Sequence, residues 1–160
     1  MIYGTLSKNL GMPTPTFLVC PDVVKFENVG QIAVVNGMVY LGGSVGIDKS
    51  GTLHRGLEEQ TRQTFDNIRK CLEYANSGLD CIVSLNIFLS TSLSDSEEAR
   101  FNELYREVFC VPTTRPCRCC VRAQLQEGFL VEVVNVVAAQ KQTARGGART
   151  LDLVIISHTR

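Results

Sequence analysis

Residues 81–90 (CIVSLNIFLS) constrain the fold more than any other segment, because they read as a strand that is apolar on both faces. A strand of this kind needs cover on both sides. Residues 57–75 and 92–109, which flank it, have apolar positions spaced three and four apart, and this spacing predicts amphipathic helices. Two helices can cover one face of a small sheet. A partner subunit is the simplest cover for the other face, so we expect an oligomer.

Both predicted helices have recognisable ends. Asn76-Ser77-Gly78 should stop the first helix, with Gly78 as its C-terminal cap. The second helix should begin within residues 92–95, where a serine or an aspartate can serve as the N-cap. The residues expected to face inward are Leu57, Thr61, Phe65, Ile68, Leu72 and Ala75 in the first helix and Phe101, Leu104, Tyr105 and Val108 in the second.

Further strands are predicted on either side of the helices. Residues 31–35 and 39–45 are apolar and β-branched, and Asn36-Gly37 between them is the strongest short signal for a tight hairpin. Residues 118–125 and 129–139 should form the last two strands. Residues 17–20 and 23–26 are candidates for short extended pieces.

The order of these elements predicts an α+β domain over residues 26–139. Residues 1–25 precede it as an arm broken by glycine and proline. Residues 140–160 form a C-terminal tail with an apolar patch at 151–156, and the sequence does not place that tail.

Charge and composition exclude several classes of protein. Sixteen basic residues balance sixteen acidic ones, which argues against nonspecific binding to nucleic acid and against electrostatic attachment to a membrane. No apolar run reaches the roughly 18–20 residues that span a bilayer. Seven cysteines, several of them inside predicted helices and strands, are typical of a reduced protein. We expect a cytoplasmic location, with mitochondrial import as the alternative.

Two charged residues are candidates for a site. Glu132 interrupts a row of alternating apolar residues, Leu130, Val134, Val136 and Ala138, and a carboxylate there is costly to bury without a partner. It either holds a water or substrate in a pocket or reaches solvent near a strand end. Arg118 begins a strand, where its guanidinium could clamp a carboxylate or could be a solvated edge residue or part of a salt bridge.

Arg115 and Arg122 are close to Arg118 in sequence and compete for any role assigned to it. No metal site is predicted. Cysteines 119 and 120 are adjacent in a strand and should point to opposite faces, and only His54 and His158 could add imidazole ligands. No histidine is positioned by the sequence to activate a cysteine nucleophile. The glycine-rich residues 42–46 do not open into a helix, so they fit close backbone approach better than a phosphate loop.

Five segments together resemble the RidA/YjgF family, the reactive intermediate imine deaminases also described as endoribonuclease L-PSP-like. In chain order they are VYLGGSVGI at 39–47, EEQT at 58–61 leading into FDNI at 65–68, FNELY at 101–105, PCRCCV at 116–121 and LVEV at 130–133. The resemblance covers roughly residues 26–139.

The resemblance implies a chorismate-mutase-like subunit, with a mixed sheet and two helices on one face, that assembles as a homotrimer with ligand sites between subunits. It implies hydrolysis of enamines and imines such as 2-aminoacrylate to 2-keto acids and ammonia, without metal or organic cofactor. Arg118 would hold the substrate carboxylate and Glu132 would position the attacking water. Gly43 and Cys120 would line the same pocket. The expected activity is that of a 2-iminobutanoate/2-iminopropanoate deaminase; the alternative is a non-catalytic member that binds small carboxylic acids or protein partners.

One departure from the family pattern concerns the strand that carries Arg118. The interval from Arg118 to Leu125 is one residue shorter than in the family. Either Arg118 lies behind a bulge, or Cys117 occupies the position at which the family has its arginine.

Overall fold

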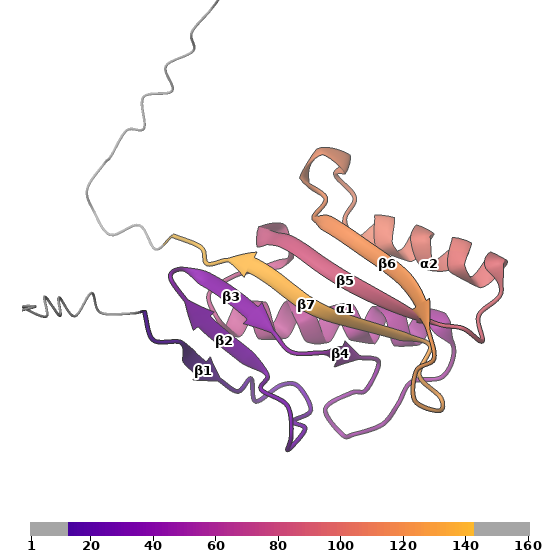
Figure 1. The fold of residues 1–160 in the computed structure, drawn as a ribbon, viewed down its shortest axis with the longest axis horizontal. Coiled ribbons are helices and arrows are strands. Elements are labelled where there is room, and N and C mark those ends of the chain that lie inside the picture. The colour runs from indigo at the N-terminus through magenta and orange to yellow at the C-terminus, as the bar shows by residue number, and fades with distance from the viewer. Residues whose placement is uncertain (1–12, 143–160) are drawn as a thin grey trace, which may run out of the picture.

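The computed structural model describes residues 13–142, which form one sheet and two helices (Figure 1). The strands follow the spatial order β1-β2-β3-β7-β5-β6, and β4 also pairs with β7. The helices and strands are β1 Thr16–Leu18, β2 Ile32–Val35, β3 Met38–Leu41, β4 Ser44–Val45, α1 Leu57–Tyr74, β5 Ile82–Ser90, α2 Asp95–Val108, β6 Cys117–Ala123 and β7 Val131–Ala139, with the short helices η1 Leu79–Cys81 and η2 Pro112–Thr114. The expected α+β class is confirmed.

The edge of the sheet begins inside the segment predicted as an arm. β1 pairs antiparallel with β2, from Thr16 opposite Val34 to Leu18 opposite Ile32. Residues 23–26, a second candidate for extended structure, form no strand. The apolar patch at 151–156 lies outside the described residues. The extended piece expected at residues 17–20 is confirmed in part, as strand β1 at the edge of the sheet.

The hairpin between β2 and β3 forms as its turn residues predict. Asn36 and Gly37 both have positive φ, at 51° and 73°. These values match the mirror-image turn whose twist suits two antiparallel strands. β3 ends at Leu41 rather than continuing to residue 45, because Gly42 and Gly43 lead the chain out of the β3 ladder before β4.

Both helices lie on the same face of the sheet, behind the strands in the view of Figure 1. α1 places its predicted apolar positions in the core, among them Phe65, Ile68 and Leu72. α2 starts at a capping box in which Ser94 and Glu97 satisfy each other's backbone N–H groups. Phe101 and Leu104 are its buried residues beside Tyr105. The helical face predicted from the sequence is confirmed.

The second helix connects two parallel strands. β5 pairs parallel with β6 in an unbroken register, from Ser84 opposite Cys117 to Ser90 opposite Ala123. A parallel pair needs a long crossover, which α2 supplies. β5 pairs antiparallel with β7 on its other side, so the sheet is mixed.

A bulge in β7 corrects the alternation expected for that strand. Asn135 adopts a φ of 51°, and the pairing with β5 moves from Val134 opposite Asn86 to Val137 opposite Ser84. One extra residue in a strand reverses the faces that follow it. Val136 and Ala138 are therefore buried on the helix side, and the prediction that they share a face with Glu132 was wrong.

Two buried amides of α1 hold the irregular segments of the chain. Gln60, only 2% exposed, donates to the carbonyl oxygens of His54 (3.0 Å) and Gly128 (2.8 Å) and accepts from the Leu130 N–H (2.8 Å). Asn67, also 2% exposed, donates to the carbonyl oxygens of Val45 and Ile47. These bonds satisfy the two buried amides and tie the loop segments to α1, and leaving such an amide unpaired would be costly.

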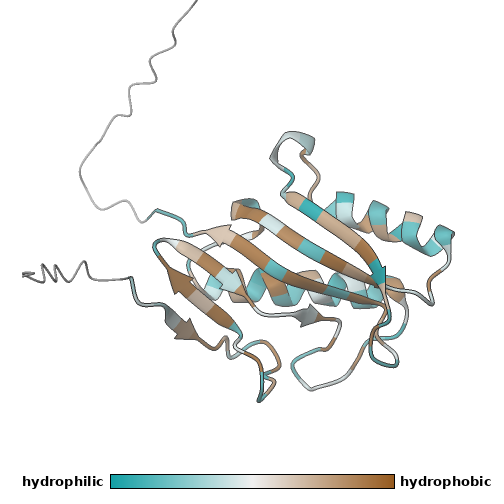
Figure 2. Cartoon of the chain, in the orientation of Figure 1, coloured by the Kyte–Doolittle hydropathy of each residue, from teal (hydrophilic) through white to brown (hydrophobic). Residues whose placement is uncertain are grey.

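The face of the sheet away from the helices stays open in a single chain. Tyr40, Val83 and Val121 are 41%, 51% and 44% exposed. Figure 2 shows hydrophobic residues along β5 and β7, many of which are buried in the core. Exposed apolar side chains gathered on one sheet face mark a contact surface.

The close approach of Gly46 to α1 can be tested by substitution. A Cβ at Gly46 would lie 2.6 Å from the Cα of Gln60, which is backbone and cannot rotate away. We expect Gly46→Ala to destabilise the fold by about 1–3 kcal/mol through overpacking. Urea unfolding measures this loss.

Gly30→Ala is the matched control, since a Cβ there meets nothing within 4 Å. Equal stability of the two variants would contradict the packing shown between Gly46 and α1.

Candidate functional site

Glu132 lies in a surface pocket of about 410 Å³ that opens beside the loop after β3. Its walls are largely apolar and come from distant parts of the chain: Phe26, Val29, Gly43, Val45, Gln124, Leu125, Gln126, Phe129 and Val134. Such a pocket, with one charged group among apolar walls, is typical of a site for a small molecule. The structure brings two of the predicted site residues, Gly43 and Glu132, into it.

The missing side chain of Gly43 leaves room for the Glu132 carboxylate. A Cβ at Gly43 would lie 2.8 Å from Oε1 of Glu132. Within residues 13–142 the carboxylate forms no hydrogen bond and no ion pair. It is half-buried and free to bind a ligand or water. Gly42 is needed for a different reason: a side chain there would strike the carbonyl oxygen of Gly30.

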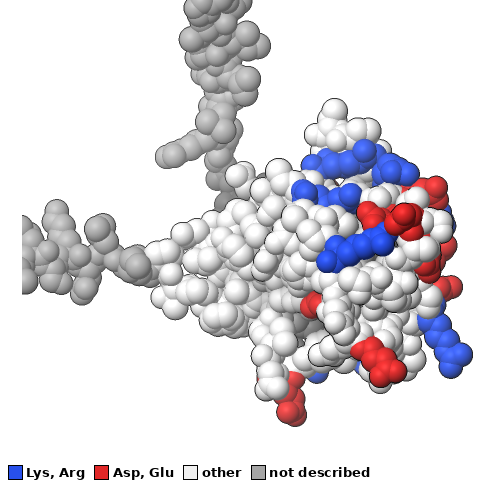
Figure 3. Space-filling view, turned by 45° about the vertical axis from the view of Figure 1, so that its right-hand side comes forward, with Lys and Arg blue, Asp and Glu red and all other residues white. Residues whose placement is uncertain are grey.

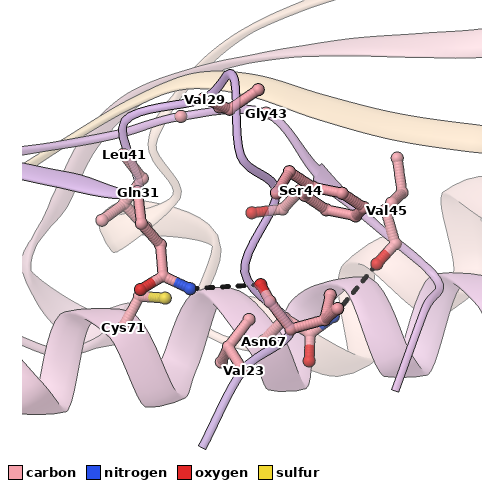
Figure 4. Close-up of a pocket in the computed structure, with 12 residues that line it drawn as sticks. Val23, Val29, Gln31, Leu41, Gly43, Ser44, Val45, Asn67 and Cys71 are labelled. Atoms are coloured by element: carbon pink, nitrogen blue, oxygen red, sulfur yellow. Dashed lines mark hydrogen bonds between the residues drawn. The ribbon is translucent and has the colours of Figure 1, made fainter. Parts of the chain in front are cut away.

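A small cavity under this loop shows how the loop is supported (Figure 4). Its volume is about 30 Å³, the space of a water, and it lies between the loop and α1. The Asn67 side chain reaches the carbonyl oxygen of Val45 at 3.0 Å, and that of Gln31 reaches the Val24 carbonyl oxygen at 3.4 Å. This cavity supports the site and is too small to hold a substrate.

Arg118 does not enter the Glu132 pocket. β5 aligns Phe88 with Glu132 on one side and with Val121 on the other, so these three residues share the open face. Arg118 is three positions before Val121 in a strand without a bulge, and its side chain therefore points to the opposite face. There it donates from Nη2 to Oδ1 of Asn102 at 2.9 Å, and its Cζ lies 4.4 Å from the centre of the Tyr105 ring.

The cysteines follow the same alternation. Cys120 lies on the helix side with Arg118, and burial raises the pKa of its thiol. Cys117 and Cys119 lie on the open face with Glu132. The shortened interval left two arrangements open, a bulge before Arg118 or Cys117 in the arginine position. β6 contains no bulge, and the Cys117 side chain lies on the face of the sheet that carries Glu132.

Arg122, a competitor of Arg118 in the sequence, is fully engaged elsewhere. It forms ion pairs with Asp95 at 2.7 Å and Glu98 at 2.8 Å, and it donates to the carbonyl oxygen of Leu93. Among the described residues no basic side chain lines the Glu132 pocket. These residues also contain no cluster of three or more histidine, cysteine or acidic side chains suited to a metal ion.

Gln60 and Asn67 are the residues that sequence reasoning missed. Their signal was present, since each interrupts the inward face of a helix whose neighbouring positions are apolar. A buried amide on such a face requires partners. Which backbone groups it would bind could be found only from the packing of the loops. Within residues 13–142, the helices fall short of the length and apolar character that crossing a bilayer demands.

Comparison with known proteins gives a consistent result. The family described as endoribonuclease L-PSP matches residues 26–140. The protein mmf1, mitochondrial, of Schizosaccharomyces pombe is 31% identical over 110 residues, which cover 69% of this chain and 65% of that protein. The protein HMF1 of Saccharomyces cerevisiae is 33% identical over 106 residues, 65% of this chain and 78% of that protein.

Solved structures share the fold. A hypothetical protein from Giardia lamblia is 97% identical, with a TM-score of 0.79, and the match covers 80% of this chain and all of that one. RidA from an Antarctic Psychrobacter is 26% identical, with a TM-score of 0.67 over 78% of this chain and 98% of that one. The mixed sheet, the two helices and the family match over most of the chain agree, and the chain belongs to the endoribonuclease L-PSP family, known also as YjgF/RidA.

Proposed function

We propose that this protein hydrolyses small imines or enamines to carbonyl compounds and ammonia in the Glu132 pocket. One observation carries the proposal: a carboxylate without a partner among the described residues lies in a largely apolar pocket, beside a glycine that leaves it space. Family membership supports the same chemistry, because the family includes the Rid proteins.

The reaction requires few catalytic groups. An enamine first takes up a proton on carbon and becomes an iminium cation, the electrophilic protonated form of an imine. Water then adds to the iminium carbon, and Glu132 accepts one of the water protons and passes it to the amine nitrogen. The carbon–nitrogen bond breaks as the carbonyl forms and the hydroxyl proton is released, so one imine and one water give one carbonyl compound and one ammonia. A positioned carboxylate can act as the general base and can stabilise the iminium cation.

The clamp that Arg118 was expected to provide has weaker support. In the single chain Arg118 and Glu132 lie on opposite faces of the sheet. For Arg118 to hold a substrate carboxylate in this pocket, it would have to come from a neighbouring subunit, or β6 would have to shift by one residue, which exchanges the two faces. Glu132 therefore has the central role in the proposal, with Gly43 as a lining residue, while Arg118 and Cys120 have roles to be tested.

We expect Glu132→Gln to lower the rate of imine hydrolysis roughly 100-fold or more, because the amide cannot accept the proton. A serine dehydratase generates 2-aminoacrylate, and added protein should accelerate the release of pyruvate. Glu127→Gln makes the same chemical change in an exposed turn outside the pocket and should retain the wild-type rate. A Glu132→Gln variant as fast as the wild type would refute the proposal.

Arg118→Ala separates the two accounts of substrate binding. If the guanidinium stays on the α2 face, its removal should change the rate less than about tenfold, because positioning in the pocket is unaffected. A loss as large as that of Glu132→Gln, measured in the same coupled assay, would place Arg118 in the working site.

Arg118 lies outside the Glu132 pocket, so the pocket lacks the arginine expected for catalysis. This favours a second candidate function, binding of small molecules without turnover. Calorimetric titration with pyruvate and with 2-oxobutanoate tests this candidate. Two observations together would establish binding without turnover in place of hydrolysis: the protein binds a keto acid saturably, and it leaves the rate of pyruvate release unchanged.

We also propose that the open face of the sheet packs against copies of the same chain in a homotrimer. Size-exclusion chromatography with light scattering should give about three times the chain mass of 17.6 kDa. Val121→Arg should break the assembly, because Val121 is exposed on this face in the single chain and a charge buried there is costly. A wild-type monomer at micromolar concentration would contradict the assembly.

A further inference from the structure

A second pocket, of about 280 Å³, lies at the end of α2, on the side of the sheet opposite the Glu132 pocket. It collects three arginines from three short stretches of chain: Arg106 in the last turn of α2, Arg115 after η2, and Arg118 near the start of β6. Asn102, Tyr105 and Pro116 complete its lining. In Figure 3, basic side chains gather at the upper right, just below the loop that carries η2 in Figure 1.

These three arginines differ from most others in the described residues. The arginines bound to carboxylates are Arg62, Arg69, Arg100 and Arg122. Within residues 13–142, Arg106, Arg115 and Arg118 form no ion pair. Arg115 donates to the carbonyl oxygen of Phe109 at 2.9 Å and Arg118 to the amide oxygen of Asn102, and both of these acceptors are neutral. Three positive charges therefore share one pocket without an ion pair to any of the described residues.

Nearby carboxylates are engaged elsewhere. Glu103 of α2 is bound to Arg100 at 2.9 Å, and Glu107 is bound to Arg62 at 2.9 Å. These contacts direct the acidic side chains of α2 away from the three arginines. An anion from solution would meet no competing carboxylate among the residues that line the pocket.

Tyr105 supplies an independent observation, a buried hydroxyl without a partner among the described residues. The residue is 5% exposed, and its hydroxyl has no hydrogen-bond partner among the described residues although the oxygen is buried. Burial raises the pKa of Tyr105, so the hydroxyl keeps its proton and can donate. Arg118 lies over the same ring. Tyr105 also lines the pocket, so its hydroxyl is a candidate donor to an anion bound there.

We propose that the pocket formed by Arg106, Arg115, Arg118 and Tyr105 binds the phosphate group of a small phosphorylated metabolite or inorganic phosphate. Guanidinium groups pair with phosphate oxygens through two parallel N–H donors, and a phosphate dianion has enough oxygens to engage several arginines together. A monocarboxylate carries one charge and two oxygens, so it compensates three arginines less well. The balanced charge of the chain favours a small anion over a long polyanion.

Calorimetric titration at constant ionic strength tests the site. Inorganic phosphate and glycerol 3-phosphate are the probes, and acetate is the monocarboxylate reference. We expect saturable binding of at least one phosphate probe, tighter than that of acetate. The tighter of the two phosphate probes identifies the source of the group, a free ion or a phosphorylated metabolite.

Substitutions assign the binding to the pocket. Arg106→Ala and Arg115→Ala should each weaken phosphate binding about tenfold or more, since each removes charge-assisted hydrogen bonds. Tyr105→Phe should weaken binding while preserving thermal stability, because the hydroxyl it removes has no hydrogen-bond partner within residues 13–142. Arg55→Ala is the matched control, an exposed arginine without an ion pair among the described residues and outside this pocket.

Three results would overturn the proposal: no saturable phosphate binding by the wild type, equal weakening by Arg55→Ala, or acetate binding as tightly as phosphate. A fourth result would replace the proposal with a nucleic-acid surface. In that case the wild type binds neither phosphate probe but binds a single-stranded oligonucleotide, and Arg106→Ala abolishes the oligonucleotide binding. The circular dichroism spectrum and melting temperature of each variant establish that it is folded.

Discussion

The buried amides of Gln60 and Asn67 are the interactions on which the rest of the structure depends. The segment between β3 and α1 crosses the surface of α1 with few ladder hydrogen bonds of its own, and the segment before β7 returns to the same helix. Gln60 binds backbone groups from both segments, at His54, Gly128 and Leu130. Asn67 binds two further carbonyl groups, at Val45 and Ile47. Removing either amide would break the side-chain hydrogen bonds that tie these segments to α1.

The same contacts shape the Glu132 pocket. The loop after β3 supplies Gly43 and Val45 to its wall, and the turn before β7 supplies Phe129. Because both segments are fixed to one rigid helix, the distance between the two sides of the pocket is set by α1 rather than by the segments themselves. This explains why a helix that contributes no residue to the pocket lining carries polar residues in its buried face.

The alternation of strand residues decides which side chains can work together. Glu132 and Arg118 were grouped by their sequence motifs, and in the single chain they are separated by the thickness of the sheet. A carboxylate on the open face is suited to the activation of water or the binding of a cation. Arg118 on the helix face, held by Asn102 and Tyr105, is suited to the binding of an anion. One strand, β6, connects these two chemistries, because the residues that follow it line the Glu132 pocket.

The sequence by itself determined the local elements and most of the core. The three-and-four spacing defined both helices and their inward faces, Asn36-Gly37 defined the hairpin, and residues 81–90 defined a strand. These features depend on contacts and dihedral preferences close in the chain. The tertiary structure alone decided the faces of the site residues. The bulge at Asn135 and the unbroken pairing of β6 with β5 set which way each side chain points, and both arise from hydrogen bonds between strands that are distant in sequence. A shift of one residue exchanges the two faces of a strand, and no pattern within β6 reveals the register that its neighbour imposes.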